Sequence, residues 1–129
     1  DIKTIVRITG DCPLIDPVIV DRAVAYYLTN KFDYVSTSKN FPDGFDTEVF
    51  SYKALKKAWE SAKTSRDREH TTTWMLRNLD CGDIPSGVKY PKRHLSVDTR
   101  EDYELICKIY EKCKPGFGID EVVEVLDEL

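Results

Sequence analysis

A carboxylate that directly follows a short hydrophobic strand is the first candidate for chemistry in this sequence. Residues 4–8 are rich in β-branched side chains and lead into Gly10 and Asp11, after which Pro13 and Pro17 mark a turn and a helix start. Ligands of open α/β sheets bind beyond the carboxyl ends of the strands, where Asp11 is expected to lie. A carboxylate there suits Mg²⁺, which takes few protein ligands and completes its shell with water and phosphate oxygens.

A second carboxylate occupies the same kind of position late in the chain. Residues 94–97 predict another strand, Asp98 follows it, and Thr99 with Asp102 forms a capping-box pattern that begins a helix. Asp11 and Asp98 can therefore meet at one edge of the sheet and hold a single Mg²⁺ between them. The alternative is local, with Asp11 closing a turn and Asp98 forming an Asx turn before the helix cap.

Asp46 and Glu48 form a further acidic pair. They are two residues apart in an expected strand over residues 45–50, so their side chains share one face of that strand. An outer face in contact with water explains the pair without any function. The turn at residues 42–44 just before the strand favours a position at the border of a cleft instead.

Arg68, Glu69 and His70 are gathered in the first turn of an expected helix over residues 67–79. A helix N-terminus favours anions, so Arg68 can clamp a carboxylate or a phosphate there. His70 can accept a proton or donate a hydrogen bond to a substrate. A solvated helix start is the alternative.

The elements that must position these residues alternate between strands and helices. The patterns predict strands over residues 2–9, 32–37, 45–50 and 94–97, a short strand around Val88 in a turn-rich segment, and helices over residues 16–30, 52–63, 67–79, 99–113 and 120–129. Such alternation is typical of an α/β sheet covered by helices. With 129 residues and no internal repeat, the chain is expected to form one domain over residues 1–129.

Composition and charge exclude several classes of function. A net charge of −4 gives no basic field that would attract nucleic acid or an acidic membrane. The apolar runs are too short to span a membrane and no signal peptide is visible, so we expect a cytoplasmic protein with four reduced cysteines. Cys12 is expected to be a buried packing residue, because no histidine lies near it in the sequence. The sequence contains no P-loop, no GxGxxG and no short zinc motif.

Four segments, taken in order, resemble the cytidylyltransferases that activate acidic sugars, and most closely their branch in spore-coat polysaccharide biosynthesis. The segments are VRITGDCPLID at residues 6–16, GFDTEVF at 44–50, DREHTT at 67–72 and SVDTREDY at 96–103. The resemblance implies a nucleotide-diphospho-sugar transferase fold, which is a three-layer α/β structure with a mainly parallel mixed sheet. It also implies transfer of CMP from CTP to a sugar hydroxyl, with release of pyrophosphate.

The resemblance also suggests roles for the candidate residues. In related enzymes the positions that match Asp11 and Asp98 bind Mg²⁺, so both are expected to be metal ligands and catalytic residues. Because they cluster in the matching motifs, substrate contacts are expected from Arg7, Asp46, Glu48, Arg68 and Glu69, and a catalytic contribution from His70. The nucleotide-binding loop of the family lies upstream of the strand at residues 2–9, so we expect a fold truncated at its amino end and inactive alone.

Truncation would leave the strand at residues 2–9 with an unpaired apolar edge, which favours a homodimer or a swapped assembly. Two other functions are compatible with the sequence. One is a non-catalytic module of the same fold that binds sugar or mediates dimerisation. The other is a metal-dependent glycosyltransferase, which is disfavoured because Cys12 and Pro13 follow Asp11 where such enzymes carry an Asp-x-Asp pair.

Overall fold

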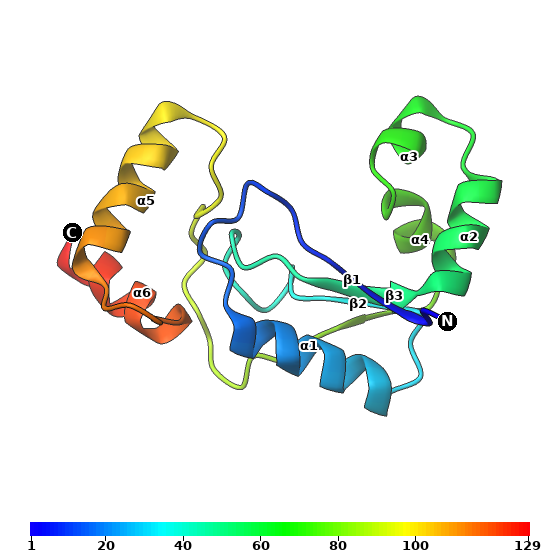
Figure 1. Cartoon of the computed structure of the whole chain (residues 1–129), viewed down its shortest axis with the longest axis horizontal. Coiled ribbons are helices and arrows are strands. Elements are labelled where there is room, and N and C mark those ends of the chain that lie inside the picture. The colour runs from blue at the N-terminus through cyan, green and yellow to red at the C-terminus, as the bar shows by residue number, and fades with distance from the viewer.

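A four-stranded mixed sheet lies at the centre of the computed structural model, which describes all 129 residues (Figure 1). Its strands are ordered β1 (Thr4–Arg7), β3 (Glu48–Ser51), β2 (Tyr34–Ser36) and β4 (Cys81–Asp83). Strand β3 is antiparallel to both β1 and β2, whereas β2 and β4 are parallel. The mixed α/β fold is therefore confirmed, although parallel pairs do not predominate among these four strands.

The first face of the sheet packs on helix α1 (Pro17–Thr29). Val35 and Val49 are directly opposite each other on β2 and β3, and both are fully buried on this face with Ile19 and Ala23 of α1. Figure 1 shows α1 running along this side of the sheet. The period-2 alternation of the strands places their next residues on the other face.

The opposite face packs on helices α2 (Tyr52–Ser61) and α4 (Thr73–Asn78). Tyr34 and Phe50 form the matching cross-strand pair there, and they are buried with Ala54, Ala58 and Met75 of the two helices. The sheet is thus covered on both sides, which gives the expected three layers.

Helices α5 (Arg100–Lys112) and α6 (Ile119–Glu128) form the far end of the molecule and extend the core formed with α1. The expected capping box of Thr99 and Asp102 begins α5. Besides this packing, the buried carboxylate of Asp16 bonds to both this end and α1. Asp16 accepts hydrogen bonds from the amide of Val18 at 2.8 Å, at the start of α1, and from the amide of Ile119 at 3.0 Å, at the start of α6.

Three predicted elements were wrong. The helix expected over residues 67–79 is divided into α3 (Ser65–Glu69) and α4, because the buried Asp67 carboxylate accepts hydrogen bonds from the Thr73 hydroxyl at 2.6 Å and from Arg77 at 2.9 Å and holds a turn between them. The strand expected over residues 94–97 is reduced to one parallel bridge between His94 and Asp43. No strand forms around Val88, and the strand in that region is β4.

Strand β1 lies at the edge of the sheet and exposes apolar side chains. Ile2, Val6 and Ile8 are 76%, 37% and 46% exposed, so this edge is open to pairing with another strand. None of the helices combines the length and apolar character that crossing a bilayer requires.

Candidate active site

Backbone hydrogen bonds bring three distant segments together beyond the end of β1. The amide of Val97 donates to the carbonyl of Asp11 at 2.8 Å, and the amide of Leu95 donates to the carbonyl of Asp43 at 2.9 Å. The segment before α5 is therefore tied to the loop after β1 and to the loop before β3. As a result, Asp98 directly follows the residue whose backbone amide is bonded to Asp11.

Gly44 allows the closest of these approaches. Its φ is +113°, and a Cβ atom at this position would lie 2.6 Å from the carbonyl carbon and oxygen of Leu95. Only glycine avoids both the strained backbone and the steric clash. The Pro-Asp-Gly sequence, which indicates a simple turn, thus also serves to place Asp43 against the segment that contains His94.

His94 lies among three carboxylates. Its Nδ1 is 2.8 Å from Asp43, and its Nε2 is 3.1 Å from Asp98 and 3.3 Å from Asp102. Burial alone would lower the pKa of His94, but the hydrogen bonds and charges of Asp43 and Asp102 outweigh it, so its pKa is raised. The raised pKa favours the positively charged form of His94, which offsets part of the negative charge of the cluster.

Asp98 and Asp102 differ in their surroundings. The amides of Asp98 and Thr99 donate to the Asp102 carboxylate at 3.0 and 2.9 Å, and these bonds lower the pKa of Asp102. The Asp98 side chain is 58% exposed and contacts only His94. One ligand atom from each of His94, Asp98 and Asp102 lies within 4.8 Å of the others, a spacing that a metal ion can bridge.

The thiol of Cys12 contacts two further carboxylates of this region, those of Asp11 and Asp46. Its thiol lies 3.5 Å from Asp46 and 3.7 Å from Asp11, and the residue is only 3% exposed. Burial is the main cause that raises the pKa of Cys12 to about 11, so the group is a protonated donor and not a nucleophile. It packs as expected and also donates to the carboxylates.

The two acids beside Cys12 are pushed toward opposite protonation states. A hydrogen bond from the Thr9 side chain is the main cause that lowers the pKa of Asp11, which is exposed and ionised. Burial, followed by the nearby charge of Asp43, raises the pKa of Asp46. A row of contacts therefore runs from Asp11 through Cys12, Asp46 and Asp43 to His94 and Asp98.

A polar cavity of about 450 Å³ opens beside this row on the face of the sheet covered by α4. Arg7 is the one cation in its lining, which also includes Thr9, Tyr34, Thr37, Ser38, Asp43, Asp46, Thr47, Glu48, Thr72 and Leu76. Arg7 and Glu48 are paired across β1 and β3, with Nη1 and Oε1 2.7 Å apart, and the Tyr34 hydroxyl donates to the other Glu48 oxygen at 2.8 Å. Glu48 therefore fixes the direction of the Arg7 guanidinium.

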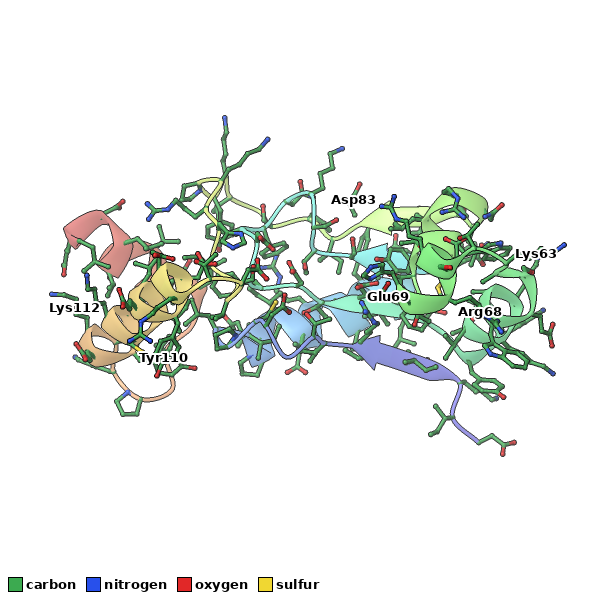
Figure 2. The ribbon with its side chains drawn as sticks, turned by 90° about the horizontal axis from the view of Figure 1, so that it is seen from above. Lys63, Arg68, Glu69, Asp83, Tyr110 and Lys112 are labelled. Atoms are coloured by element: carbon green, nitrogen blue, oxygen red, sulfur yellow. The ribbon has the colours of Figure 1, made fainter.

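Arg68, Glu69 and His70 are not among the residues that line this cavity, although Thr72, two residues after His70, is. Arg68 and Glu69 lie in α3 (Figure 2), and His70 follows it directly. Arg68 donates to the Trp59 carbonyl at 3.0 Å, and its guanidinium lies over the Trp59 ring. Helix α3 has five residues, its first turn is capped by Thr64, and its basic residues lie in its last turn. Arg68, Glu69 and His70 are therefore not in the first turn of one long helix, as the sequence pattern predicted.

Sequence reasoning missed Asp43, His94 and Asp102 as members of the site. The local sequence explains Asp43 as part of a Pro-Asp-Gly turn and Asp102 as part of a helix capping box, so neither pattern indicates a functional site. The spacing of four residues between His94, Asp98 and Asp102 is the one signal in the sequence that these side chains could be neighbours. That spacing is typical of one face of a helix, but α5 begins only at Arg100, so a helix does not explain their proximity.

Comparison with known proteins identifies the class. A family model for cytidylyltransferases matches residues 1–129, so the chain belongs to the cytidylyltransferase family. The spore coat polysaccharide biosynthesis protein SpsF of Bacillus subtilis is 28% identical over 97% of this chain and 55% of its own length. An uncharacterized protein of Methanocaldococcus jannaschii is 37% identical over 96% of this chain and 53% of its own.

The fold agrees with this assignment. A solved cytidylyltransferase from Leptospira borgpetersenii superposes with a TM-score of 0.87 and 30% identity, covering 98% of this chain and 56% of that protein. The chain thus spans about half the length of the relatives it matches.

Proposed function

We propose that the full-length protein transfers CMP from CTP to a hydroxyl group of an acidic sugar, with release of pyrophosphate, for the synthesis of a cell-surface or spore-coat polysaccharide. The observation that carries this proposal is the convergence of Asp11, Asp46, Asp43 and Asp98 beside a polar cavity, in a chain that matches the cytidylyltransferase family over its whole length. The name of the Bacillus subtilis relative supports the polysaccharide pathway.

Asp11 and Asp98 would hold Mg²⁺, with the remaining positions left to water and phosphate oxygens. Their chemistry fits, because both are exposed carboxylates in adjacent segments and Mg²⁺ prefers oxygen ligands. When bound, the ion would neutralise negative charge on the phosphates and lower the pKa of the attacking hydroxyl. Binding of the ion would require Asp98 to leave its contact with His94, since His94 Nε2 and the Asp98 carboxylate are 3.1 Å apart.

The chain's own residues would position the sugar. The guanidinium of Arg7 retains donors that point to no protein acceptor, and these can bind an anionic group of the sugar. Asp46 and Asp43 can accept hydrogen bonds from sugar hydroxyls in the same cavity. The roles of Arg68, Glu69 and His70 stay predictions from the family resemblance.

Turnover of CTP by the full-length protein tests the proposal. Pyrophosphate release should require CTP, Mg²⁺ and an acidic sugar such as N-acetylneuraminate or 3-deoxy-manno-octulosonate. Asp11→Asn and Asp98→Asn should each lower kcat by at least about 100-fold if they position the metal, whereas Asp21→Asn, an exposed acid on α1, should leave it unchanged. Sugar binding without any pyrophosphate release would instead favour a non-catalytic module.

Two features of the whole protein belong to the same proposal. Residues 1–129 alone should not turn over CTP, because the chain spans only about half of its relatives. We also expect a homodimer, and light scattering of the full-length protein tests this expectation without any substrate.

A further inference from the structure

The carboxylate of Glu48 is shared between side chains of its two neighbouring strands. Its Oε1 accepts from Arg7 at 2.7 Å, and its Oε2 accepts from the Tyr34 hydroxyl at 2.8 Å. The register of the sheet explains the sharing, because Glu48 is directly opposite Arg7 on β1 and Ser36 on β2. Tyr34 lies two residues before Ser36 and therefore on the same face. The Ser36 hydroxyl is 3.0 Å from that of Ser38, which leaves the second Glu48 oxygen to Tyr34.

Tyr34 is the fixed end of this series of hydrogen bonds. The residue is 3% exposed, and its ring is stacked on Phe50 with the ring centroids 6.2 Å apart. Both rings pack in the core with Met75 of α4. Burial, followed by the charge and hydrogen bond of Glu48, raises the pKa of Tyr34, so its hydroxyl stays protonated and donates to Glu48.

Arg7 is the end of the series that can reach a ligand. Its Nη1 is bonded to Glu48, whereas its Nε and Nη2 donate to no protein acceptor. These two nitrogens form one edge of the planar guanidinium, and two parallel N–H groups on one edge match both oxygens of a carboxylate. Because Arg7 is the one cation in the lining of the polar cavity, a carboxylate in that cavity would find its counter-ion in this chain only there.

We propose that Tyr34 and Glu48 are positioning residues, which hold Arg7 so that its free Nε–Nη2 edge binds both oxygens of the sugar's carboxylate. Glu48 acts through Arg7 and not on the sugar, because each of its oxygens already accepts a hydrogen bond. Arg7 is on the edge strand β1, and an unsupported arginine there would lose side-chain freedom on binding the sugar. The bond to Glu48 restricts that freedom before the sugar arrives. The inference rests on the proposed function, which supplies the acidic sugar.

Steady-state kinetics of two variants of the full-length protein test the positioning role. Glu48→Gln should raise KM for the acidic sugar by at least about tenfold, and Tyr34→Phe by at least about threefold, with kcat and KM for CTP within about twofold of wild type. The double variant should be no worse than Glu48→Gln, because Tyr34 acts through Glu48. Tyr26→Phe removes a hydroxyl from α1 on the other face of the sheet, and this matched control should leave both KM values unchanged.

NMR of the full-length protein labelled with ¹⁵N-arginine separates this inference from the proposed function, since it requires no turnover. Loss of one Nε signal in Arg7→Lys assigns the signal of Arg7. N-acetylneuraminate or 3-deoxy-manno-octulosonate, added without CTP or Mg²⁺, should shift that signal, whereas the methyl ester of the same sugar should not. Glu48→Gln should raise the sugar concentration that gives half of the shift by at least about tenfold.

The outcomes of the two experiments are distinct. An Arg7 signal that neither sugar shifts, equal effects of Tyr34→Phe and Tyr26→Phe, or an effect of Tyr34→Phe that persists in full beside Glu48→Gln would overturn the inference. A shift of the Arg7 signal without any pyrophosphate release would reject CMP transfer and support the assignment of Arg7. Circular dichroism establishes that each variant is folded, and if Glu48→Gln is not, Tyr34→Phe decides both experiments.

Discussion

Replacing Asp16 should show how strongly one side chain couples the two ends of the fold. The carboxylate is 5% exposed and accepts one hydrogen bond from Val18 at 2.8 Å and another from Ile119 at 3.0 Å. It therefore caps α1 and binds the first amide of α6, which lies 103 residues away in sequence. Both amides are at helix N-termini, where a negative charge is stabilised by the helix dipole.

The magnitude follows from the number of bonds. A hydrogen bond to a charged group contributes about 1.5–3 kcal/mol. Asp16→Asn keeps one carbonyl oxygen but presents an amide NH₂ to the second N–H, so it should lower the free energy of unfolding by about 2–3 kcal/mol. Asp16→Ala leaves both amides without a side-chain partner, and the Ile119 amide is buried, so this variant should cost about 3–6 kcal/mol.

Urea unfolding of the full-length protein, followed by far-UV circular dichroism, measures these effects. With a slope of about 1–3 kcal/mol per molar urea, the Asn variant should shift the midpoint down by roughly 1 M. Asp21→Asn, on the exposed side of the same helix, is the matched control and should be within about 0.5 kcal/mol of wild type. An Asp16→Asn protein as stable as the control would show that the carboxylate does not bridge the two helices.

Three further predictions concern the site. Cys12 should resist iodoacetamide at pH 8 in the folded protein and react after unfolding in urea, because burial raises its pKa to about 11; rapid native labelling seen by peptide mass spectrometry would contradict this. Proton NMR of His94 should give a midpoint above the ordinary value of about 6.5, which Asp43→Asn lowers. Because the folded-state pKa is raised, the stabilisation from this group is complete below the unfolded pKa and is lost as pH rises through the folded pKa. Gly44→Ala should destabilise the protein by about 2–4 kcal/mol in urea unfolding, since it adds positive-φ strain to a clash with Leu95, and an unchanged midpoint would refute the close approach.

Much of the fold could be predicted from local patterns. The helices at α1, α2, α5 and α6 follow apolar periodicity with clear caps at Asp16, Ser51 and Thr99, so their starts agree closely with the structure. Strand β4 could not be predicted, because Cys-Gly-Asp has little β-propensity. It forms because Gly82 lets the chain pass against Phe32, where a Cβ atom would lie 2.5 Å from the ring.

The same distinction applies to the site. Asp11 and Asp98 could be selected as candidates from the sequence, because each follows an expected strand and precedes a turn or helix signal. The segment at residues 94–97 has the apolar pattern of a strand, but its amides are divided between two partners, with Leu95 bonded to Asp43 and Val97 to Asp11. Because its amides bond to two different loops, this segment does not pair with one neighbouring strand, and it links the loop after β1 to the loop before β3. Local sequence carries no record of those long-range bonds.

The charge of the site explains why its side chains are paired as they are. Five carboxylates, those of Asp11, Asp43, Asp46, Asp98 and Asp102, occupy segments joined by backbone bonds, and like charges at such spacing repel. The fold relieves this repulsion with groups that carry or share protons. The positive charge favoured on His94 lies between three of the acids, the protonated thiol of Cys12 lies between two, and a raised pKa favours a proton on Asp46. Each of these groups offsets negative charge that the Mg²⁺ of the proposed function would also offset, so binding of that ion would have to displace the protons from them.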